Sequence, residues 1–259
     1  MIGEICKRCG GSGVVLTSEV GTFGIYFEPR EIVFTEPCPE CRGGHEGKVE
    51  KVRHRANIPP AYYEATLEAF DWNGYEDDKG TVDLSLQKKF VDSFVNDFEK
   101  WQAEGLGLYI YSSIRGTGKT FLASCICNEL MKQKALVSKF VSASELIKMD
   151  HEDSKTNFEK SQIETLCECS LLVIDDLGQQ KSGENWLDDI LFRIIDYRYQ
   201  HKLVTCITSN IELKRLRLDD RVSDRLNKMC QNLPLPEISY RQKESNKSKK
   251  EFFKDLGLM

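Results

Sequence analysis

A short glycine-containing segment, Ser113–Thr120 (Ser-Ile-Arg-Gly-Thr-Gly-Lys-Thr), limits most strongly what this chain can fold into. The apolar run 108–111 precedes the segment, and a helical pattern over 121–131 follows it. A strand, a glycine-containing turn and a helix in this order form a phosphate-binding loop, because backbone N–H groups and the helix N-terminus face the anion. Ser113 stands where the strict pattern has its first glycine. A purely structural Gly-Lys turn is the alternative, and it leaves the residues downstream unexplained.

Each residue type in this loop has an expected chemical role. Gly116 and Gly118 let the backbone approach phosphate groups without a Cβ in the way. Lys119 is expected to reach the β- and γ-phosphates, and the Thr120 hydroxyl to bind Mg²⁺. The residues predicted to bind the nucleotide are Ser113, Arg115, Gly116, Thr117, Gly118, Lys119, Thr120 and Asp175.

Polar residues follow two expected strands further along the chain. Asp175 and Asp176 come directly after the apolar run 171–174, so their carboxylates are expected beside the phosphates. Asp175 would hold Mg²⁺, directly or through water, and Asp176 would polarise the attacking water. Glutamate is commoner in that second role, and the shorter aspartate predicts slow hydrolysis. Asn210 ends the next strand and is expected to orient the same water. A surface aspartate pair at a strand end is the alternative interpretation.

Strand-like and helical patterns alternate through most of the chain. The phenylalanine-rich stripe Leu86, Phe90, Phe94, Phe98 and Trp101 predicts a helix that stops at Gly105. Strands are expected at 108–111, 136–141, 171–174, 203–207 and 235–238, with a helix around 187–195. This alternation predicts an α/β fold with a parallel sheet covered on both faces.

Three arginines in the last fifth of the chain are candidate catalytic residues. Arg221 and Arg225 are four residues apart and share one face of a short helix. Such a pair is usually a solvated face, but beside a nucleotide site either arginine can act as a finger that stabilises transition-state charge in a neighbouring subunit. Arg241 follows the last apolar run and is expected to reach the γ-phosphate of its own subunit.

Four cysteines near the N-terminus have the spacing of a structural zinc site. Cys6 and Cys9 form one Cys-x-x-Cys pair, and Cys38 and Cys41 form a second. Two such pairs, each followed by glycines, predict a closed Cys₄ tetrahedron that leaves no open position for catalysis. Free thiols or a redox motif are the alternatives, but a redox motif needs one pair in a βαβ context. The other six cysteines are expected to be buried thiols.

Composition excludes several classes of protein. With 36 Lys+Arg and 41 Asp+Glu, the net charge is −5, which argues against holding duplex DNA by bulk charge. No apolar run exceeds four residues, whereas a membrane span needs about 20. The N-terminus has no apolar stretch of the signal-peptide kind, so we expect a soluble, cytoplasmic protein. In that reducing compartment the ten cysteines are not expected to form disulfides.

The chain divides into four parts by composition. Residues 1–55 are expected to form a small zinc-binding, β-rich domain, with β-type runs at 13–16, 23–27 and 31–34. Residues 56–80 are expected to be a linker, because they contain prolines and acidic residues. Residues 81–242 carry the nucleotide motifs, and 243–259 form a basic tail.

Taken together, these motifs resemble the AAA+ helicase loaders of bacteria and their phages, the DnaC/DnaI family, with the related IstB transposition ATPases. Besides the nucleotide motifs, the resemblance rests on Ala56–Pro59, on Tyr62-Tyr63 with Thr66–Phe70, on Ile174–Gly178, on Tyr197–Tyr199 and on Thr208–Asn210. Arg221–Arg225 resembles the family's box VII, and Ser239–Arg241 its sensor 2. The departures are Ser113 and Ile114, where the family commonly has glycine and proline.

The resemblance implies an AAA+ P-loop NTPase with a five-stranded sheet, ATP, Mg²⁺ and Zn²⁺. It implies a zinc-bearing domain that grips a DnaB-type hexameric replicative helicase, self-association with ATP or with the helicase, and placement of the helicase on single-stranded DNA. The family places a DNA-facing helical insertion where this chain has 142–165, with Lys148, Lys155 and Lys160 as candidate contacts. That stretch is net negative, and 150–157 is interpreted as a linker between helices.

Two other functions remain open at this point. An IstB-like transposition ATPase has the same fold, wraps DNA and recruits a transposase, although that group typically lacks a Cys₄ module. A nucleotide-binding adaptor with weak or no hydrolysis is the other alternative, because of Ser113 and Asp176.

Overall fold

A computed structural model of the chain describes residues 14–21, 30–37, 56–78, 80–134, 136–153, 157–178, 185–241, 252 and 254. The chain separates into two compact units, Met1–His54 and Arg55–Met259. In the first unit, β1 (Val14–Gly21) pairs with β2 (Arg30–Pro37) in an antiparallel register from Val14↔Pro37 to Gly21↔Arg30. These strands contain most of the expected runs 13–16 and 31–34. Cys6, Cys9, Cys38, Cys41 and the run 23–27 lie outside the described residues.

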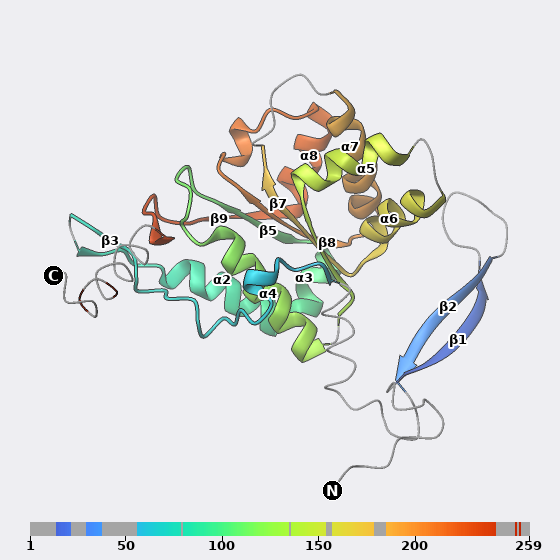
Figure 1. The fold of residues 1–259 in the computed structure, drawn as a ribbon, viewed down its shortest axis with the longest axis horizontal. Coiled ribbons are helices and arrows are strands. Elements are labelled where there is room, and N and C mark those ends of the chain that lie inside the picture. Colours follow the sequence, from blue (N-terminus) through green and yellow to red (C-terminus); the bar gives the residue numbers. More distant parts are fainter. Residues whose placement is uncertain are drawn as a thin grey trace, which may run out of the picture. The chain divides into compact units, whose positions relative to one another are not determined.

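The second unit is built on a sheet of five parallel strands (Figure 1). The strands are β5 (Gly107–Tyr111), β6 (Ser138–Ser142), β7 (Leu171–Leu177), β8 (Val204–Ser209) and β9 (Cys230–Pro234). Their order across the sheet is β6-β7-β8-β5-β9, which places β5 between two strands that come much later in the sequence. The predicted five-stranded parallel sheet is therefore confirmed. In such a sheet ligands bind at the carboxyl ends of the strands, and the loop after β5 lies at that edge.

The fifth strand is not where the sequence predicted it. We expected a strand at 235–238, but the chain pairs with β5 through Cys230–Pro234, and residues 235–238 follow the strand. The reason is that β9 is an edge strand, which tolerates the partly exposed polar residues Gln231 and Asn232. Pro236 interrupts the apolar run that suggested the strand.

Helices cover both faces of this sheet (Figure 1). The helices α2 (Ser85–Asn96), α3 (Phe98–Glu104) and α4 (Lys119–Lys134) lie on one side. The helices α5 (Ala143–Asp153), α6 (Asn157–Glu168), α7 (Asn185–Gln200) and α8 (Asp220–Met229) lie on the other. Along β5 the side chains alternate between these layers, so Tyr109 joins the core beneath α7 and α8.

The first predicted helix is two helices in the structure. The backbone leaves helical geometry at Asp97 (φ −108°, ψ 30°), and Leu86 is exposed while Phe94 and Phe98 are buried. The predicted stop at Gly105 is confirmed, because Gly105 adopts a left-handed conformation with φ 68°. A short 3₁₀ turn, η2 (Leu213–Arg215), precedes α8.

The stretch 56–78 packs against the sheet unit and belongs to it. It contains the 3₁₀ turn η1 (Pro60–Tyr62) and β3 (Glu76–Asp77), which pairs with β4 (Gly80–Thr81). Asn128 on α4 donates hydrogen bonds to the carbonyls of Tyr62 and Ala65, at 3.1 and 2.9 Å. Because these contacts hold the stretch on α4, most of the segment 56–80, which we expected to be a linker, is packed as part of the second unit.

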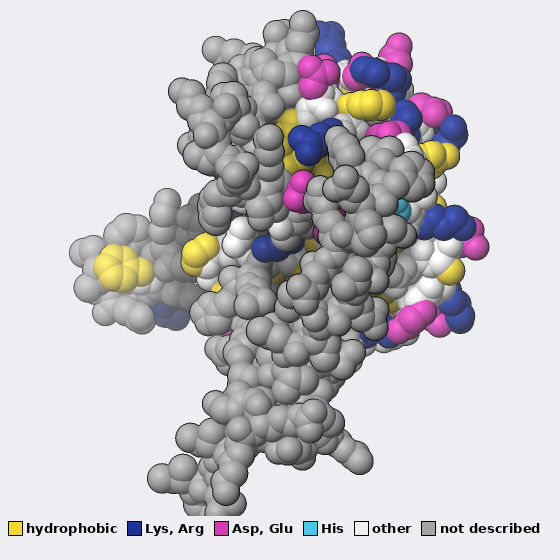
Figure 2. Space-filling model, turned by 90° about the vertical axis from the view of Figure 1, so that its right-hand side faces the viewer, with side chains coloured by type: hydrophobic (Ala, Val, Ile, Leu, Met, Phe, Trp, Pro, Cys, Tyr) yellow, Lys and Arg dark blue, Asp and Glu magenta, His cyan; other side chains and the backbone are white. Residues whose placement is uncertain are grey.

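Charges are mixed on the one face of the described residues that Figure 2 shows. On the face in Figure 2, Lys and Arg side chains alternate with Asp and Glu side chains, and hydrophobic side chains lie between them. Among the described residues, no helix is both long enough and apolar enough to cross a membrane.

Candidate nucleotide-binding site

The segment Ser113–Thr120 follows β5 and contains the loop before α4 and the first two residues of that helix, as the sequence predicted. Gly116 and Gly118 have positive φ angles of 78° and 88°, which residues with a Cβ adopt only at a cost. At Gly116 a Cβ would also meet the Ser239 hydroxyl oxygen at 2.8 Å and the Arg241 Cβ at 3.0 Å. These glycines therefore permit both the curl of the loop and its contact with the residues after β9.

Lys119 begins α4 and is buried within the loop. Its Nζ donates to the Ser112 carbonyl at 3.2 Å, to the Ile114 carbonyl at 2.9 Å and to the Thr117 hydroxyl at 3.3 Å. Burial lowers the pKa of this amine to about 8, and the charges of Asp176 and Asp175 act in the opposite direction. The ammonium group is thus held at the centre of the curl, where an incoming phosphate would replace neutral acceptors with charged ones.

A second set of contacts joins α4 to the ends of β7 and β8. Thr120 Oγ1 donates to Asp175 Oδ1 at 2.9 Å, and Thr208 Oγ1 donates to the same oxygen at 2.6 Å. Burial raises the pKa of Asp175, and the hydrogen bond from Thr208 opposes that rise. A threonine hydroxyl beside a carboxylate is an oxygen-rich arrangement of the kind that Mg²⁺ prefers, so these residues fit the predicted magnesium site.

Most of the predicted residues surround one cavity of about 460 Å³. The predicted residues on its wall are Arg115, Gly116, Thr117, Gly118, Lys119, Thr120, Asp176, Asn210 and Arg241. Asp175 lies behind Thr120, to which it is hydrogen-bonded. Ser113 is exposed and its hydroxyl donates to a carboxylate oxygen of Glu237, so its side chain is directed to the residues after β9.

The sequence did not predict the aromatic wall of this cavity. Tyr62, Phe70 and Tyr75 come from the stretch 56–78 and line the cavity together with Phe121 and Tyr240. The Phe70 and Phe121 rings stack with centroids 6.2 Å apart, and the Tyr75 hydroxyl donates to the Thr117 carbonyl at 2.7 Å. An apolar, aromatic end beside a polar end fits a nucleotide, whose base is flat and whose phosphates are charged. The only signal in the sequence was the family resemblance of residues 56–70.

Residues after β9 close the cavity on its other side. The Arg241 N–H donates to the Gly116 carbonyl at 3.0 Å, and the Tyr240 hydroxyl donates to Asp71 Oδ2 at 3.3 Å. The exposed Arg241 side chain therefore starts from a backbone that is tied directly to the loop between β5 and α4.

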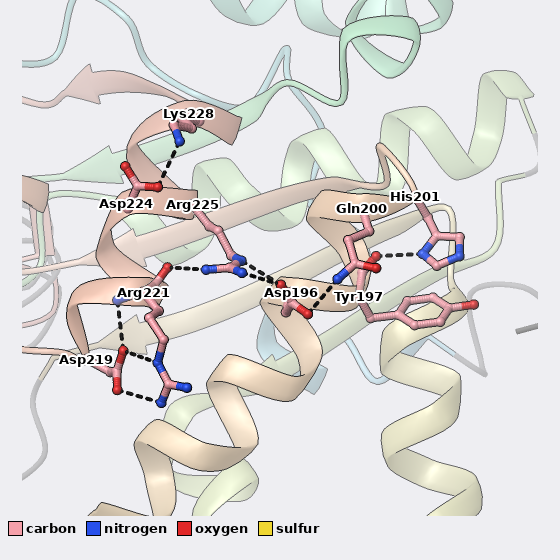
Figure 3. A network of polar contacts seen from close by, with 9 residues as sticks. All are labelled: Asp196, Tyr197, Gln200, His201, Asp219, Arg221, Asp224, Arg225 and Lys228. Carbon is pink, nitrogen blue, oxygen red and sulfur yellow. Dashed lines mark hydrogen bonds and ion pairs between the residues drawn. The ribbon is translucent and has the colours of Figure 1, made fainter. Parts of the chain in front are cut away.

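Arg221 and Arg225 are absent from the described cavity wall and lie on α8 (Figure 3). Arg225 pairs with Asp196 on α7 and donates to the Arg221 carbonyl at 3.0 Å. Arg221 pairs with Asp219, the helix N-cap, at 2.9 Å, and its guanidinium lies 4.2 Å from the centre of the Phe192 ring. Their side chains are 57% exposed for Arg221 and 23% for Arg225. The structure thus does not bring these two arginines to their own subunit's cavity.

The described residues contain no group of three or more His, Cys, Asp or Glu side chains that could hold a metal ion. The six described cysteines are all buried, as expected. Burial raises the pKa of Cys125, Cys127 and Cys206 to about 12, so these thiols stay protonated.

Comparison with known proteins agrees with this geometry. The profile of the family described as "IstB-like ATP binding protein" matches residues 49–248. The chain is 27% identical to "Replicative helicase loader DnaC" of Escherichia coli strain K12 over 184 residues, which cover 69% of each protein. It is 26% identical to "Uncharacterized protein YdaV" of the same strain over 194 residues, 73% of each protein.

A solved structure, "Crystal Structure of the DnaI", superimposes with a TM-score of 0.58 at 26% identity. The match covers 70% of this chain and 95% of that one, which confirms the AAA+ P-loop fold. Since the family profile spans well over half of the residues, the chain belongs to the IstB-like ATP-binding family and is related to the DnaC and DnaI proteins.

Proposed function

We propose that this chain is an ATP-dependent loader that binds a DnaB-type hexameric replicative helicase and places it on single-stranded DNA during the initiation of replication. The observation that carries the proposal is the single cavity on which Lys119, Asp176, Asn210 and Arg241 converge, in a chain similar to the loader DnaC.

The residues of the cavity divide into groups that bind and groups that react. Backbone N–H groups of the loop and Lys119 bind the phosphates, and the aromatic wall holds the base. Thr120 and Asp175 hold Mg²⁺, which neutralises phosphate charge when bound. Asp176 and Asn210, both on the cavity wall, orient and polarise the attacking water. Arg241 stabilises the charge of the γ-phosphate within the same subunit.

An arginine from a neighbouring subunit completes the site in this proposal. Arg221 is the better candidate for the finger, because its partner Asp219 is on the same helix end and its side chain is largely exposed. Arg225 is fixed to Asp196 on α7 and serves to anchor α8. Hydrolysis therefore depends on self-association, which a loader can couple to the presence of the helicase ring.

The N-terminal unit is the proposed docking element for the helicase. Four thiolates at Cys6, Cys9, Cys38 and Cys41 are a donor set that binds Zn²⁺ tightly and leaves no reactive position. A segment of about 54 residues rarely folds on a hydrophobic core alone, so an ion held by these thiolates would supply much of its stability. A zinc-stabilised module of this kind is suited to holding a protein partner.

Size-exclusion chromatography with a DnaB-type hexamer and MgATP tests the proposal. The chain should co-elute with the hexamer and should stimulate its transfer to a single-stranded DNA circle. Lys119→Ala is the matched variant, because it should retain docking through the N-terminal unit but lose ATP-dependent transfer. Absence of co-elution of the wild-type chain in the presence of ATP would exclude a loader.

Transposition is the second candidate, favoured by the description of the matched family. An IstB-like helper should bind duplex DNA with ATP and recruit a transposase without binding the helicase hexamer. The adaptor alternative is tested in parallel by steady-state ATP hydrolysis. A chain that binds ATP and the hexamer but shows no turnover above Lys119→Ala would be an adaptor.

A further inference from the structure

Strand β7 carries a bulge at the two aspartates. Its pairing with β8 runs in register up to Ile174↔Ile207 and resumes at Leu177↔Ser209. Two residues of β7, Asp175 and Asp176, therefore oppose the single residue Thr208. An extra residue in one strand interrupts the ladder and redirects a side chain, and such bulges are frequent next to active sites.

The bulge places Asp176 in an unusual backbone conformation. Its φ is 57°, in the left-handed region that residues with a Cβ adopt only rarely. In this conformation Asp176 lies on the wall of the nucleotide cavity, whereas Asp175, its neighbour in the bulge, lies behind Thr120. A conformation of this kind persists only where surrounding contacts hold it.

The Thr208 side chain supplies those contacts. Its hydroxyl oxygen accepts the Asp176 backbone N–H at 2.9 Å, so it replaces the carbonyl that the interrupted ladder does not provide. The same hydroxyl donates its hydrogen to Asp175 Oδ1 at 2.6 Å. The Thr208 side chain is fully buried and is not on the described cavity wall. One hydroxyl thus restrains the backbone of one aspartate and the carboxylate of the other.

We infer that Thr208 is a positioning residue for ATP hydrolysis, whose hydroxyl sets both the magnesium-side carboxylate Asp175 and the water-side carboxylate Asp176. This inference rests on the proposed ATPase activity and assigns a role to a residue that is not on the described cavity wall. Without the hydroxyl, the Asp176 backbone N–H loses its hydrogen-bond acceptor, which stabilises the left-handed conformation of that residue. The carboxylate then moves from its place on the cavity wall, while the phosphate-binding loop keeps its shape.

The test compares Thr208→Val, which keeps the shape and removes the hydroxyl, with Thr208→Ser, which keeps the hydroxyl. For Thr208→Val we expect kcat to fall by about 10- to 100-fold, the loss typical of a misplaced catalytic group. The dissociation constant for ATP should change by less than about threefold. Thr208 is not on the described cavity wall, and the aspartates that it positions act in hydrolysis, so mainly the catalytic step is affected. Thr208→Ser should retain turnover close to that of the wild-type chain.

The split between turnover and ATP affinity supplies a readout that a purely structural role would not give. We expect Thr208→Val to lose turnover without losing affinity for ATP, and Thr208→Ser to restore the turnover. A folded Thr208→Val variant with wild-type kcat would overturn the inference.

Two further outcomes are decisive. Where Thr208→Val does not fold, Thr208→Ala takes its place, since it removes the hydroxyl without burying a further methyl group in its position. If neither variant folds, the hydroxyl serves the fold and the inference falls. Absence of ATP turnover in the wild-type chain would refute the proposed ATPase, whereas turnover that is unaffected by Thr208→Val would refute only the role of Thr208.

Discussion

Replacement of Tyr75 by phenylalanine isolates one contact between the stretch 56–78 and the phosphate-binding loop. The Tyr75 side chain is 1% exposed and its hydroxyl donates to the Thr117 carbonyl at 2.7 Å. Its ring packs between Phe70 and Tyr240, at centroid distances of 6.3 and 5.9 Å. Phenylalanine keeps that packing, so the variant removes only the hydroxyl. Burial raises the pKa of Tyr75, which keeps the hydroxyl protonated and able to donate.

The expected cost follows from leaving a buried carbonyl without its donor, which is about 1–3 kcal/mol. For a unit of this size, each kcal/mol lowers Tm by about 2–4 °C. The same loss loosens the phosphate-binding loop and so weakens ATP binding. If the whole free-energy loss acted on binding, the dissociation constant would rise roughly tenfold for each 1.4 kcal/mol. Tyr75→Phe should therefore lower both Tm and the affinity for ATP.

Thermal unfolding and titration with MgATP measure the two effects. Tyr240→Phe is the control, because its hydroxyl bond to Asp71 is longer, at 3.3 Å, and exposed. That control should shift Tm by less than about 1 °C, since exposed polar contacts contribute little. Equal Tm and equal affinity in Tyr75→Phe and the wild-type chain would refute the idea that this stretch supports the loop.

Three further predictions concern pH, the arginines and zinc. Because the pKa of Lys119 is about 8 without nucleotide, ATP affinity should fall as pH rises from 8 to 10, accompanied by proton uptake on binding; a flat titration would contradict this. Arg225→Ala should lower Tm by about 2–4 °C, because it removes a half-buried ion pair. Arg221→Ala should leave Tm unchanged, and the variant should inhibit hydrolysis by wild-type subunits when it is mixed with them. Equal Tm in both variants would contradict this assignment. Metal analysis should find one zinc per chain, lost in Cys38→Ser and retained in the buried control Cys206→Ser.

The sequence predicted the parts of the site that are continuous along the chain. The loop at Lys119 is flanked by its own strand and helix, and Asp176 follows directly from an apolar strand, so each could be recognised from local spacing. Asn210 was predicted for the same reason, because parallel strands end at one edge of the sheet.

Features that depend on distant contacts were not visible in the sequence. The aromatic wall joins Phe70 to Phe121 across about fifty residues, and no periodic pattern marks such a pair. The sequence predicted the last strand too far along the chain. Strand β9 has a neighbouring strand on one side only, so partly exposed polar residues such as Gln231 and Asn232 can occupy it and hide the strand pattern. The bulge opposite Thr208 is defined by how β7 and β8 pair. The sequence pattern of one strand carries no information on its register with another strand.

Equilibrium titration of the purified chain with MgATP tests the central claim most directly. A saturable site with one nucleotide per chain and a dissociation constant below about 1 mM is predicted, with loss of binding in Lys119→Ala. Binding that is absent up to that concentration, or that is identical in the wild-type chain and Lys119→Ala, would contradict the assignment of the cavity as a nucleotide site.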